Sequence, residues 1–227
     1  EKNNLKKCIE GKRIEPGPAG SPYRGRLDVL PSGRNIYAND PLSLPSRSSY
    51  SQGGKIADEF VKSYLQENGE WPKSTIIDLW GSATMRTGGE EFSMALNLLG
   101  AKPIWVDGTE RVSGIEILPV ALLDRPRVDV TLRVSGLFRD IFPTLSILYN
   151  QVIQALSERD ENPEWNPFIK KKRSPRVFGP RPGTYGIKGD FDTSKEFEIN
   201  KKIVGESWLE SSSWSINGNE FKQELSE

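Results

Sequence analysis

Two stretches of this chain place charged side chains beside glycines where an apolar segment gives way to a helix. The first covers residues 76–90 and reads IIDLWGSATMRTGGE, and the second covers residues 135–140 and reads SGLFRD. Exposed backbone N–H groups and charged side chains at the carboxyl end of a strand form the usual ligand site of open α/β sheets. Because the carboxyl ends of parallel strands share one edge, we expect the two turns to lie together.

The first turn offers Arg86 and Glu90 as residues at the rim of a cleft, where glycines let a ligand approach the backbone. The spacing of Thr87 and Glu90 also matches a capping box, in which each side chain accepts a hydrogen bond from the other residue's N–H. Glu90 is therefore either a helix cap or a catalytic carboxylate. Glu91 is expected to be a solvated acid of the first turn.

The second turn offers Arg139, whose planar guanidinium could hold a substrate carboxylate or amide through two hydrogen bonds. The alternative is an internal ion pair with Asp140 or another acid, and Asp140 could itself cap the following helix. Further along, Tyr185 could present its ring to a flat ligand or simply anchor its loop.

Composition excludes several kinds of chemistry. The 227 residues contain no histidine, and Cys8 is the one cysteine. Histidine triads, histidine zinc sites and internal disulfides are therefore absent, so any chemistry must use carboxylates, Lys, Arg, Tyr or the backbone. We assign no metal-ligating residues.

The charge balance bears on partners. Lys and Arg together number 31, as do Asp and Glu, so no overall field favours nucleic acid or acidic membranes. The basic run at 170–173 could contact phosphates but is more typical of a solvated face. No apolar run approaches the roughly 20 residues that span a bilayer. We expect a cytoplasmic protein that binds neither nucleic acid nor membrane.

Hydrophobic periodicity predicts the elements that position these turns. Helices are expected at about 51–67, 88–99 and 143–158, and strands at 75–80, 103–106, 114–118 and 128–135, with a turn at Asp107-Gly108. This alternation predicts an α/β fold with a mainly parallel sheet covered by helices on both faces. The expected organisation is an extended Pro/Gly-rich arm at 1–50, the α/β domain at 51–160, and a linker, basic loop and irregular tail at 161–227.

Five blocks in the same order resemble the CobN subunit of cobaltochelatase and, more loosely, the H subunit of magnesium chelatase. They are LPSGRNIY at 30–37, LWGSATMRTGGE at 79–90, RPRVDV at 125–130, SGLFRDIFP at 135–143 and RVFGPRPGTYG at 176–186. The resemblance implies a piece of a large tetrapyrrole-binding subunit, a ligase that forms nitrogen–metal bonds and inserts Co²⁺ into a corrin of the hydrogenobyrinic acid diamide type. It also implies an AAA+ ATPase that hydrolyses ATP and a second accessory subunit as partners.

The same resemblance selects candidate site residues at matched positions. Glu90 is the candidate catalytic residue, and the candidate substrate-binding residues are Arg34, Arg86, Arg139, Asp140 and Tyr185. The family is several times longer and carries a histidine-rich segment that this chain lacks, so we expect this piece to be inactive alone. The alternatives are a non-catalytic scaffold that docks a partner and a magnesium chelatase H-type subunit acting on protoporphyrin. A nucleotide- or sugar-binding domain is disfavoured because no Gly-x-Gly-x-x-Gly or Walker loop is present.

Overall fold

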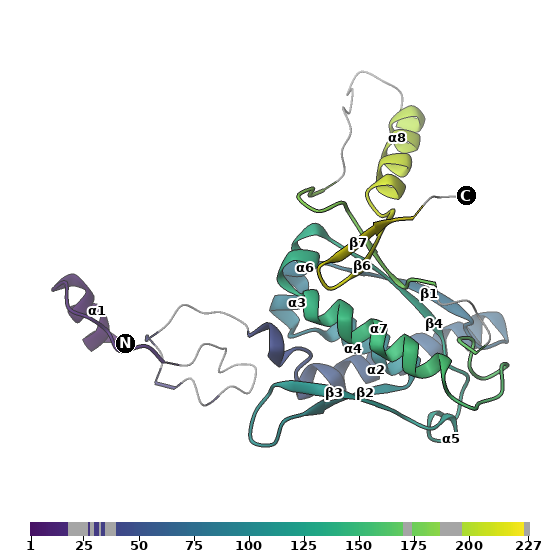
Figure 1. The fold of residues 1–227 in the computed structure, drawn as a ribbon, viewed down its shortest axis with the longest axis horizontal. Helices are drawn as coiled ribbons and strands as arrows, with labels where there is room; N and C mark the ends of the chain where they lie inside the picture. The colour runs from purple at the N-terminus through teal and green to yellow at the C-terminus, as the bar shows by residue number, and fades with distance from the viewer. Residues whose placement is uncertain are drawn as a thin grey trace.

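The computed structural model describes residues 1–17, 27, 30–31, 33–34, 40–169, 174–186 and 197–224. Its elements, shown in Figure 1, are α1 (Lys2–Ile9), η3 (Pro41–Ser43), α2 (Arg47–Asn68), β1 (Ser74–Leu79), α3 (Gly81–Thr87), α4 (Glu90–Leu99), β2 (Ala101–Trp105), β3 (Val112–Ile117), α5 (Val120–Leu123), β4 (Asp129–Val134), α6 (Gly136–Ile141), α7 (Pro143–Ser157), β5 (Val177–Gly179), α8 (Phe197–Glu210), β6 (Trp214–Asn217) and β7 (Glu220–Gln223).

A five-stranded sheet with the order β1-β4-β5-β6-β7 forms the centre of the body. Strands β1, β4 and β5 are parallel, and β6 and β7 add two antiparallel pairings. The α/β class is confirmed and the predicted parallel strands 75–80 and 128–135 are found as β1 and β4. The sheet as a whole is mixed, because the chain returns through a hairpin at its end.

The hydrophobic core lies between this sheet and helices α4 and α7. Val130, Leu132 and Val134 of β4 are almost completely buried, and their alternation turns them to one face of the sheet. Helix α4 packs on β1 and β4, α7 packs on β5 and β6, and α2 lies against α4 (Figure 1). Each fully buried side chain of this size stabilises the fold by about 1.5–3 kcal/mol.

Helix α7 follows its sequence prediction closely. Pro143 occupies its first turn, where a missing N–H costs nothing, and Leu145, Val152 and Leu156 are buried. The Tyr149 hydroxyl donates a hydrogen bond of 2.8 Å to the Val130 carbonyl, which ties the helix to the central strand. Burial raises the pKa of this tyrosine well above its ordinary value.

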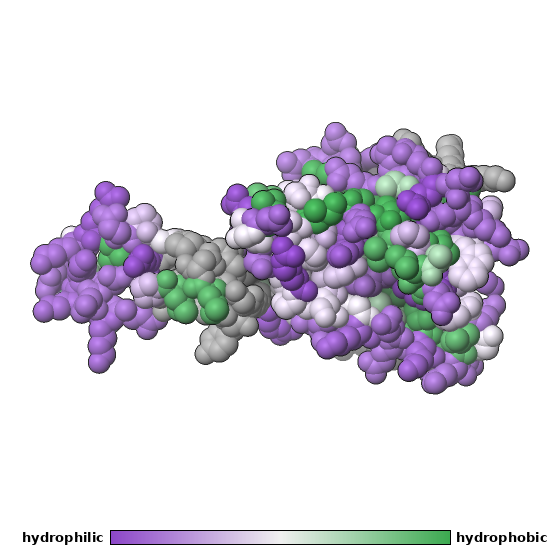
Figure 2. Space-filling view, turned by 90° about the horizontal axis from the view of Figure 1, so that it is seen from below, coloured by the Kyte–Doolittle hydropathy of each residue, from purple (hydrophilic) through white to green (hydrophobic). Residues whose placement is uncertain are grey.

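The strands predicted at 103–106 and 114–118 pair with each other as β2 and β3, in a two-stranded antiparallel sheet of their own. The turn at Asp107-Gly108 reverses the chain, with Gly108 in the left-handed region. The two strands therefore pair with each other, and neither joins the parallel sheet. Seen from below the body, the side on which this hairpin lies, hydrophobic residues gather in a band across the body with hydrophilic residues on both sides of it (Figure 2).

Both ends of the chain carry more secondary structure than the sequence indicated. The arm contains α1, which ends before the first proline, and the tail forms α8 and the β6–β7 hairpin. The Gly218-Asn219 pair between β6 and β7 is a hairpin signal, and Gly218 has a φ of 61°. The basic run at 170–173 and half of the block at 30–37 lie outside the described residues. Within the described part, no helix is long and apolar enough to cross a bilayer.

Candidate functional site

The candidate site is the carboxyl edge of the sheet, which we define as the ends of β1, β4 and β5 with the segments 80–90, 135–140 and 180–186 that follow them. Leu79 and Val134 are register partners, so the segments after β1 and β4 leave the sheet side by side. The Ser135 N–H donates to the Leu79 carbonyl at 2.9 Å. The expectation that both charged turns share one edge is confirmed.

Ser135 joins the two turns through its hydroxyl. The Ser135 Oγ accepts hydrogen bonds from the N–H of Phe138 at 3.2 Å and of Gly81 at 3.1 Å. The first bond caps helix α6, and the second holds the start of α3 against it. One side chain therefore fixes the relative position of the segments that carry Arg86 and Arg139.

Glycines allow the three segments to touch backbone to backbone. A Cβ on Gly81 would lie 2.8 Å from the Phe138 N, one on Gly136 would lie 2.7 Å from the Thr184 O, and one on Gly179 would lie 2.8 Å from the Val134 O. Real Cβ atoms do not approach backbone atoms this closely. One glycine in each of these three motif blocks is thus required by packing at the carboxyl edge.

We expect Gly136→Ala to destabilise the chain by about 1–3 kcal/mol, because the new methyl group would overlap the Thr184 carbonyl and the Tyr185 ring. Chemical denaturation followed by circular dichroism measures the change. The matched control is Gly205→Ala in α8, where a Cβ meets no atom within 4 Å, and this variant should be neutral or slightly stabilised. Equal stabilities of the two variants would contradict the close packing.

Arg139, Asp140 and Tyr185 come together at this edge. The Arg139 Nε donates to the Asp140 Oδ1 at 2.6 Å and Nη2 donates to Oδ2 at 3.0 Å. The Arg139 Nη1 donates to the carbonyls of Pro180, Arg181 and Thr184 at 2.9, 2.6 and 3.4 Å. The Tyr185 hydroxyl donates to the Asp140 carboxylate, and its ring lies 5.5 Å from the guanidinium.

The structure departs from the expectation that the Arg139 guanidinium is free to bind a substrate. Its side chain is fully buried, and its guanidinium is already bound to one carboxylate and three carbonyls of the loop after β5. The internal ion pair that the sequence left open is what forms. Arg139 positions the 180–186 loop, while Asp140 and Tyr185 keep exposed surface, with Tyr185 61% exposed.

The hydrogen bond from Arg139 lowers the pKa of Asp140, and the bond to Asp140 raises the pKa of the exposed Tyr185. Since the folded-state pKa of Asp140 lies below its unfolded value, its contribution to stability is present above about pH 4 and is lost as the pH falls through the folded pKa. We expect Asp140→Asn to reduce stability at neutral pH and to flatten the acid limb of the profile.

Thermal unfolding temperatures between about pH 7 and pH 3 measure this effect, since that window brackets the ordinary carboxyl pKa. Asp160→Asn, an exposed acid beyond the end of α7, serves as the control. An Asp140→Asn profile parallel to that of the unchanged chain would show that the ion pair does not stabilise the fold.

The turn that carries Glu90 differs from its prediction. Residues 81–87 form helix α3, and Gly88 and Gly89, both with positive φ, link it to α4. The Thr87 hydroxyl accepts from the Glu90 N–H at 3.2 Å, as in a capping box, but its carboxylate neighbour is Glu91, at 3.3 Å. Only half of the predicted capping box forms.

Glu90 is half-buried at the first position of α4, and its carboxylate has no hydrogen bond or ion pair among the described residues. Because α4 ends beside the start of β4, where the Val128 N–H donates to the Leu98 carbonyl, Glu90 lies at the opposite end, toward the carboxyl edge. The helix dipole favours a negative charge at this position. Arg86 is exposed on α3, and Arg34 is exposed in the arm.

Sequence reasoning did not select Trp80, which follows β1 at the carboxyl edge and is 55% exposed. Its indole N–H donates to Asp78, and Asp78 accepts from Arg133 at 3.0 Å. The Arg133 guanidinium lies 5.9 Å from the Trp80 ring and 5.3 Å from the Trp208 ring of α8. The signal that could have identified Trp80 is an aromatic residue directly after a buried strand, beside the first glycine of the motif.

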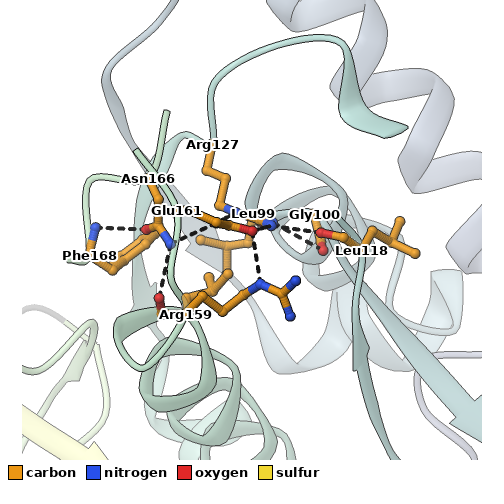
Figure 3. Close-up of polar contacts among 9 residues, drawn as sticks. Leu99, Gly100, Leu118, Arg127, Arg159, Glu161, Asn166 and Phe168 are labelled. Carbon is orange, nitrogen blue, oxygen red and sulfur yellow. Dashed lines mark hydrogen bonds and ion pairs between the residues drawn. The ribbon is translucent and has the colours of Figure 1, made fainter. Parts of the chain in front are cut away.

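The block at 125–130 has a structural role at the other end of the sheet (Figure 3). Arg125 donates to the carbonyls of Asn97 and Leu98. Arg127 donates to the carbonyl of Leu99 at 2.7 Å, as Figure 3 shows, so both arginines satisfy the last carbonyls of α4. Arg127 also binds both carboxylate oxygens of Glu161, at 2.9 and 2.8 Å. We call this group the arginine clamp.

Further bonds complete the arginine clamp. Glu161 accepts from Arg159 and Asn166, and Asn166 donates to the Leu156 carbonyl at the end of α7 (Figure 3). Burial alone would raise the pKa of Glu161, but the hydrogen bonds and charge of Arg127 lower it overall. The clamp thereby joins α4, β4 and α7, which places the carboxyl edge at the far end of rigid elements.

The described residues contain no group of three or more His, Cys, Asp or Glu arranged to hold a metal ion. The acids at the carboxyl edge are instead dispersed, with Glu90 on α4, Asp140 on α6 and Asp78 on β1. A pocket of about 370 Å³ lies elsewhere, between α7, the start of β5 and the β6–β7 hairpin, and Ile153, Phe168 and Phe221 supply part of its apolar lining. None of the predicted site residues lines it.

The chain is similar to known chelatase subunits over most of its length. The family model described as CobN/Magnesium Chelatase matches residues 1–223. The aerobic cobaltochelatase subunit CobN of Pseudomonas aeruginosa is 43% identical over 206 residues, which cover 82% of this chain and 16% of that subunit. The magnesium-chelatase H subunit of Chlorobaculum parvum is 35% identical over 200 residues, with the same coverage of each chain.

A solved structure is also similar. The catalytic subunit of cobaltochelatase from Mycobacterium tuberculosis superimposes with a TM-score of 0.73 and 33% sequence identity, over 96% of this chain and 20% of that one. This chain thus spans about a sixth of the length of the curated relatives, 16% in each case. The full-length match of the family model and the identity to its members show that the chain belongs to the CobN/magnesium chelatase family.

Proposed function

We propose that this chain forms part of the tetrapyrrole-binding body of a CobN-type large subunit, a cytoplasmic ligase that inserts Co²⁺ into a corrin ring during cobalamin biosynthesis. One observation carries the proposal: three of the five motif blocks, far apart in sequence, meet at the carboxyl edge. A fourth block forms the arginine clamp at the opposite end. In this proposal Co²⁺ is a substrate, and partner subunits, one of them an AAA+ ATPase, hydrolyse ATP.

The carboxyl edge offers the groups that metal insertion requires. The reaction removes water from a divalent cation and protons from the ring nitrogens, which carboxylates can assist, while cationic side chains can bind the carboxylate or amide arms of the ring. Glu90, whose carboxylate has no partner among the described residues, is the proposed proton acceptor or metal relay. Exposed Arg86 is proposed to bind the ring's arms at this edge, and Arg34, which lies in the N-terminal arm outside the edge, is proposed to bind them as well.

Arg139, Asp140 and Tyr185 have a different proposed role. Asp140 and Tyr185 keep exposed surface and are proposed to contact the ring, while buried Arg139 acts as a positioning residue that fixes both. The exposed indole of Trp80 adds a flat apolar surface on the same edge, suited to the face of a macrocycle. Asp140 lies on helix α6, and the loop that carries Tyr185 is held by hydrogen bonds from Arg139, which is the kind of support that preorganises a site.

Two alternatives rest on specific observations. The buried ion pairs of Arg139 and Arg127 show how motif residues can serve structure alone, which favours a scaffold that docks a partner. The 35% identity to a magnesium-chelatase H subunit favours a porphyrin substrate. The higher identity to CobN, 43%, is the reason for preferring a corrin.

Absorbance titration of the full-length subunit with a metal-free corrinoid and with protoporphyrin separates these functions. We expect saturable band shifts with the corrinoid, and at least a tenfold weaker response, about 1.4 kcal/mol, with the porphyrin. Tyr185→Ala should weaken corrinoid binding, and Trp71→Ala, an exposed aromatic at the opposite end of β1, should leave it unchanged. A Soret shift alone would favour the magnesium enzyme, and no shift with either ring would favour the scaffold.

A further inference from the structure

The first strand of the sheet has an unpaired outer edge. Strand β1 stands at one end of the strand order and pairs with β4 alone. The carbonyls of Lys73 and Leu79 accept from the N–H groups of Asp129 and Ser135, so the odd-numbered residues of β1 bond to β4. By the alternation of a strand, the backbone groups of Ser74, Ile76 and Asp78 point outward. No described residue hydrogen-bonds to them.

The middle of β1 has the character of an interior strand. The strand reads STIIDL, in which the apolar Ile76 and Ile77 point to opposite faces of the sheet and are flanked by Thr75 and Asp78. Parallel strands buried on both faces carry apolar side chains on both. Ile77 and Leu79 face α4 and are buried, whereas Ile76 points to the other face and is 64% exposed.

The opposite edge of the same sheet provides an internal comparison. Strand β7 carries Glu220 and Lys222 with exposed side chains, and charged residues are the usual protection of a solvent-facing edge. Strand β1 carries one charged side chain, Asp78, which is bound to Arg133 and Trp80, and between Thr75 and Ile77 it has no charge, proline or bulge that would discourage pairing. The middle of the β1 edge therefore exposes the apolar Ile76, whereas β7 exposes charged side chains.

We infer that β1 receives an additional β-strand from the part of the full-length subunit that lies outside residues 1–227. Family members are about six times longer than this chain, which covers 16% of them, so most of the polypeptide is available to supply it. The added strand would hydrogen-bond to Ser74, Ile76 and Asp78 and would carry an apolar side chain over Ile76. This is strand addition within one polypeptide, with backbone bonds supplying the affinity.

Strand addition would extend the central sheet beyond β1 and bring another segment's end to the carboxyl edge, beside Trp80. The inference does not depend on the proposed function, because it concerns only the backbone of β1 and the covering of Ile76. A subunit that binds no tetrapyrrole could still contain the added strand.

Residue-level hydrogen exchange in the full-length subunit tests this inference. The amides of Ile76 and Asp78 face the outer edge, and the amide of Ile77, bonded to β4, is the internal reference. We expect the outer amides to exchange within about tenfold of Ile77 in the full-length subunit, and at least about 100-fold faster than Ile77 in the 227-residue chain. If the outer amides are unprotected in the full-length subunit, or protected only at high concentration or after partner subunits are added, the inference is wrong.

A substitution provides a second test. Ile76→Lys should leave the unfolding temperature of the chain unchanged, because the side chain is exposed there, and should lower that of the full-length subunit. Gln223→Lys on the exposed edge strand β7 is the matched control and should change neither. A full-length subunit that tolerates Ile76→Lys as well as the control would contradict the added strand. Exchange in the full-length subunit remains decisive even if the shorter chain does not fold.

Discussion

Replacing Arg127 with Met is expected to destabilise the chain by about 3–5 kcal/mol, a large share of the roughly 5–15 kcal/mol by which native proteins are stable. The substitution leaves the Glu161 carboxylate without its main partner in a mostly buried place and removes donors from the carbonyls of Leu99 and Leu118. An uncompensated buried charge costs more than a lost surface pair. Urea denaturation, with the unfolding temperature as a second measure, gives the size of the effect.

Arg159→Met is the control for this prediction. Arg159 binds the same Glu161 carboxylate at 2.8 Å but is 36% exposed along its side chain, so we expect a loss of about 1 kcal/mol or less. Arg127→Met combined with Glu161→Met should recover part of the stability, since a pair of apolar side chains leaves no buried charge. Similar losses for Arg127→Met and Arg159→Met would contradict the arginine clamp.

Replacing Glu90 with Gln in the full-length subunit is expected to lower the initial rate of Co²⁺ insertion about 10²–10⁴-fold, the range for loss of a general acid or base. Glutamine keeps the size and polarity of the side chain but cannot accept a proton or carry the charge that attracts the cation. Because the Glu90 carboxylate has no hydrogen bond or ion pair with the described residues, the fold and the affinity for the corrin should be unchanged. The rate is measured in the complex reconstituted with its partner subunits and ATP.

Glu91→Gln is the matched control for Glu90→Gln. Glu91 is the next residue of the same helix turn, and its carboxylate is bonded to the Thr87 hydroxyl at 3.3 Å. We expect this variant to retain nearly full activity. If both variants lose activity equally, the effect is local structure, and if neither does, Glu90 is not the relay. A Glu90→Gln subunit that no longer binds corrin would assign the residue to binding.

The sequence predicted the elements whose apolar spacing is strong. Helix α7 and strand β4 lie within one or two residues of their expected bounds. The spacing of their apolar residues indicates a helix or a strand without any knowledge of how the rest of the chain folds. Helices α3 and α6 were missed, since each is short and follows a strand directly, so its glycine was interpreted as a turn. The β6–β7 hairpin was missed because the polar tail outweighed the Gly-Asn signal.

The candidate site likewise has features that the sequence predicted and features that it did not. That two charged turns share one edge follows from parallel strands and needs no coordinates. That the third segment, 180–186, closes over Arg139 depends on β5 pairing with β4 across more than forty residues of intervening chain. Sequence alone gave Arg139 two possible partners and could not choose between them.

Family membership, the α/β class and the residue types available for chemistry were determined by the sequence itself, since motif order, periodicity and the absence of histidine are properties of the chain. Tertiary structure decided which charged side chains form hydrogen bonds and ion pairs inside the protein. Arg139 and Arg127 are buried and bound, while Glu90 and Arg86 are not in described pairs, because only the packed fold determines which side chains lose water and must find partners. The same packing left the apolar Ile76 exposed at the β1 edge of the sheet, whereas the β7 edge exposes charged side chains.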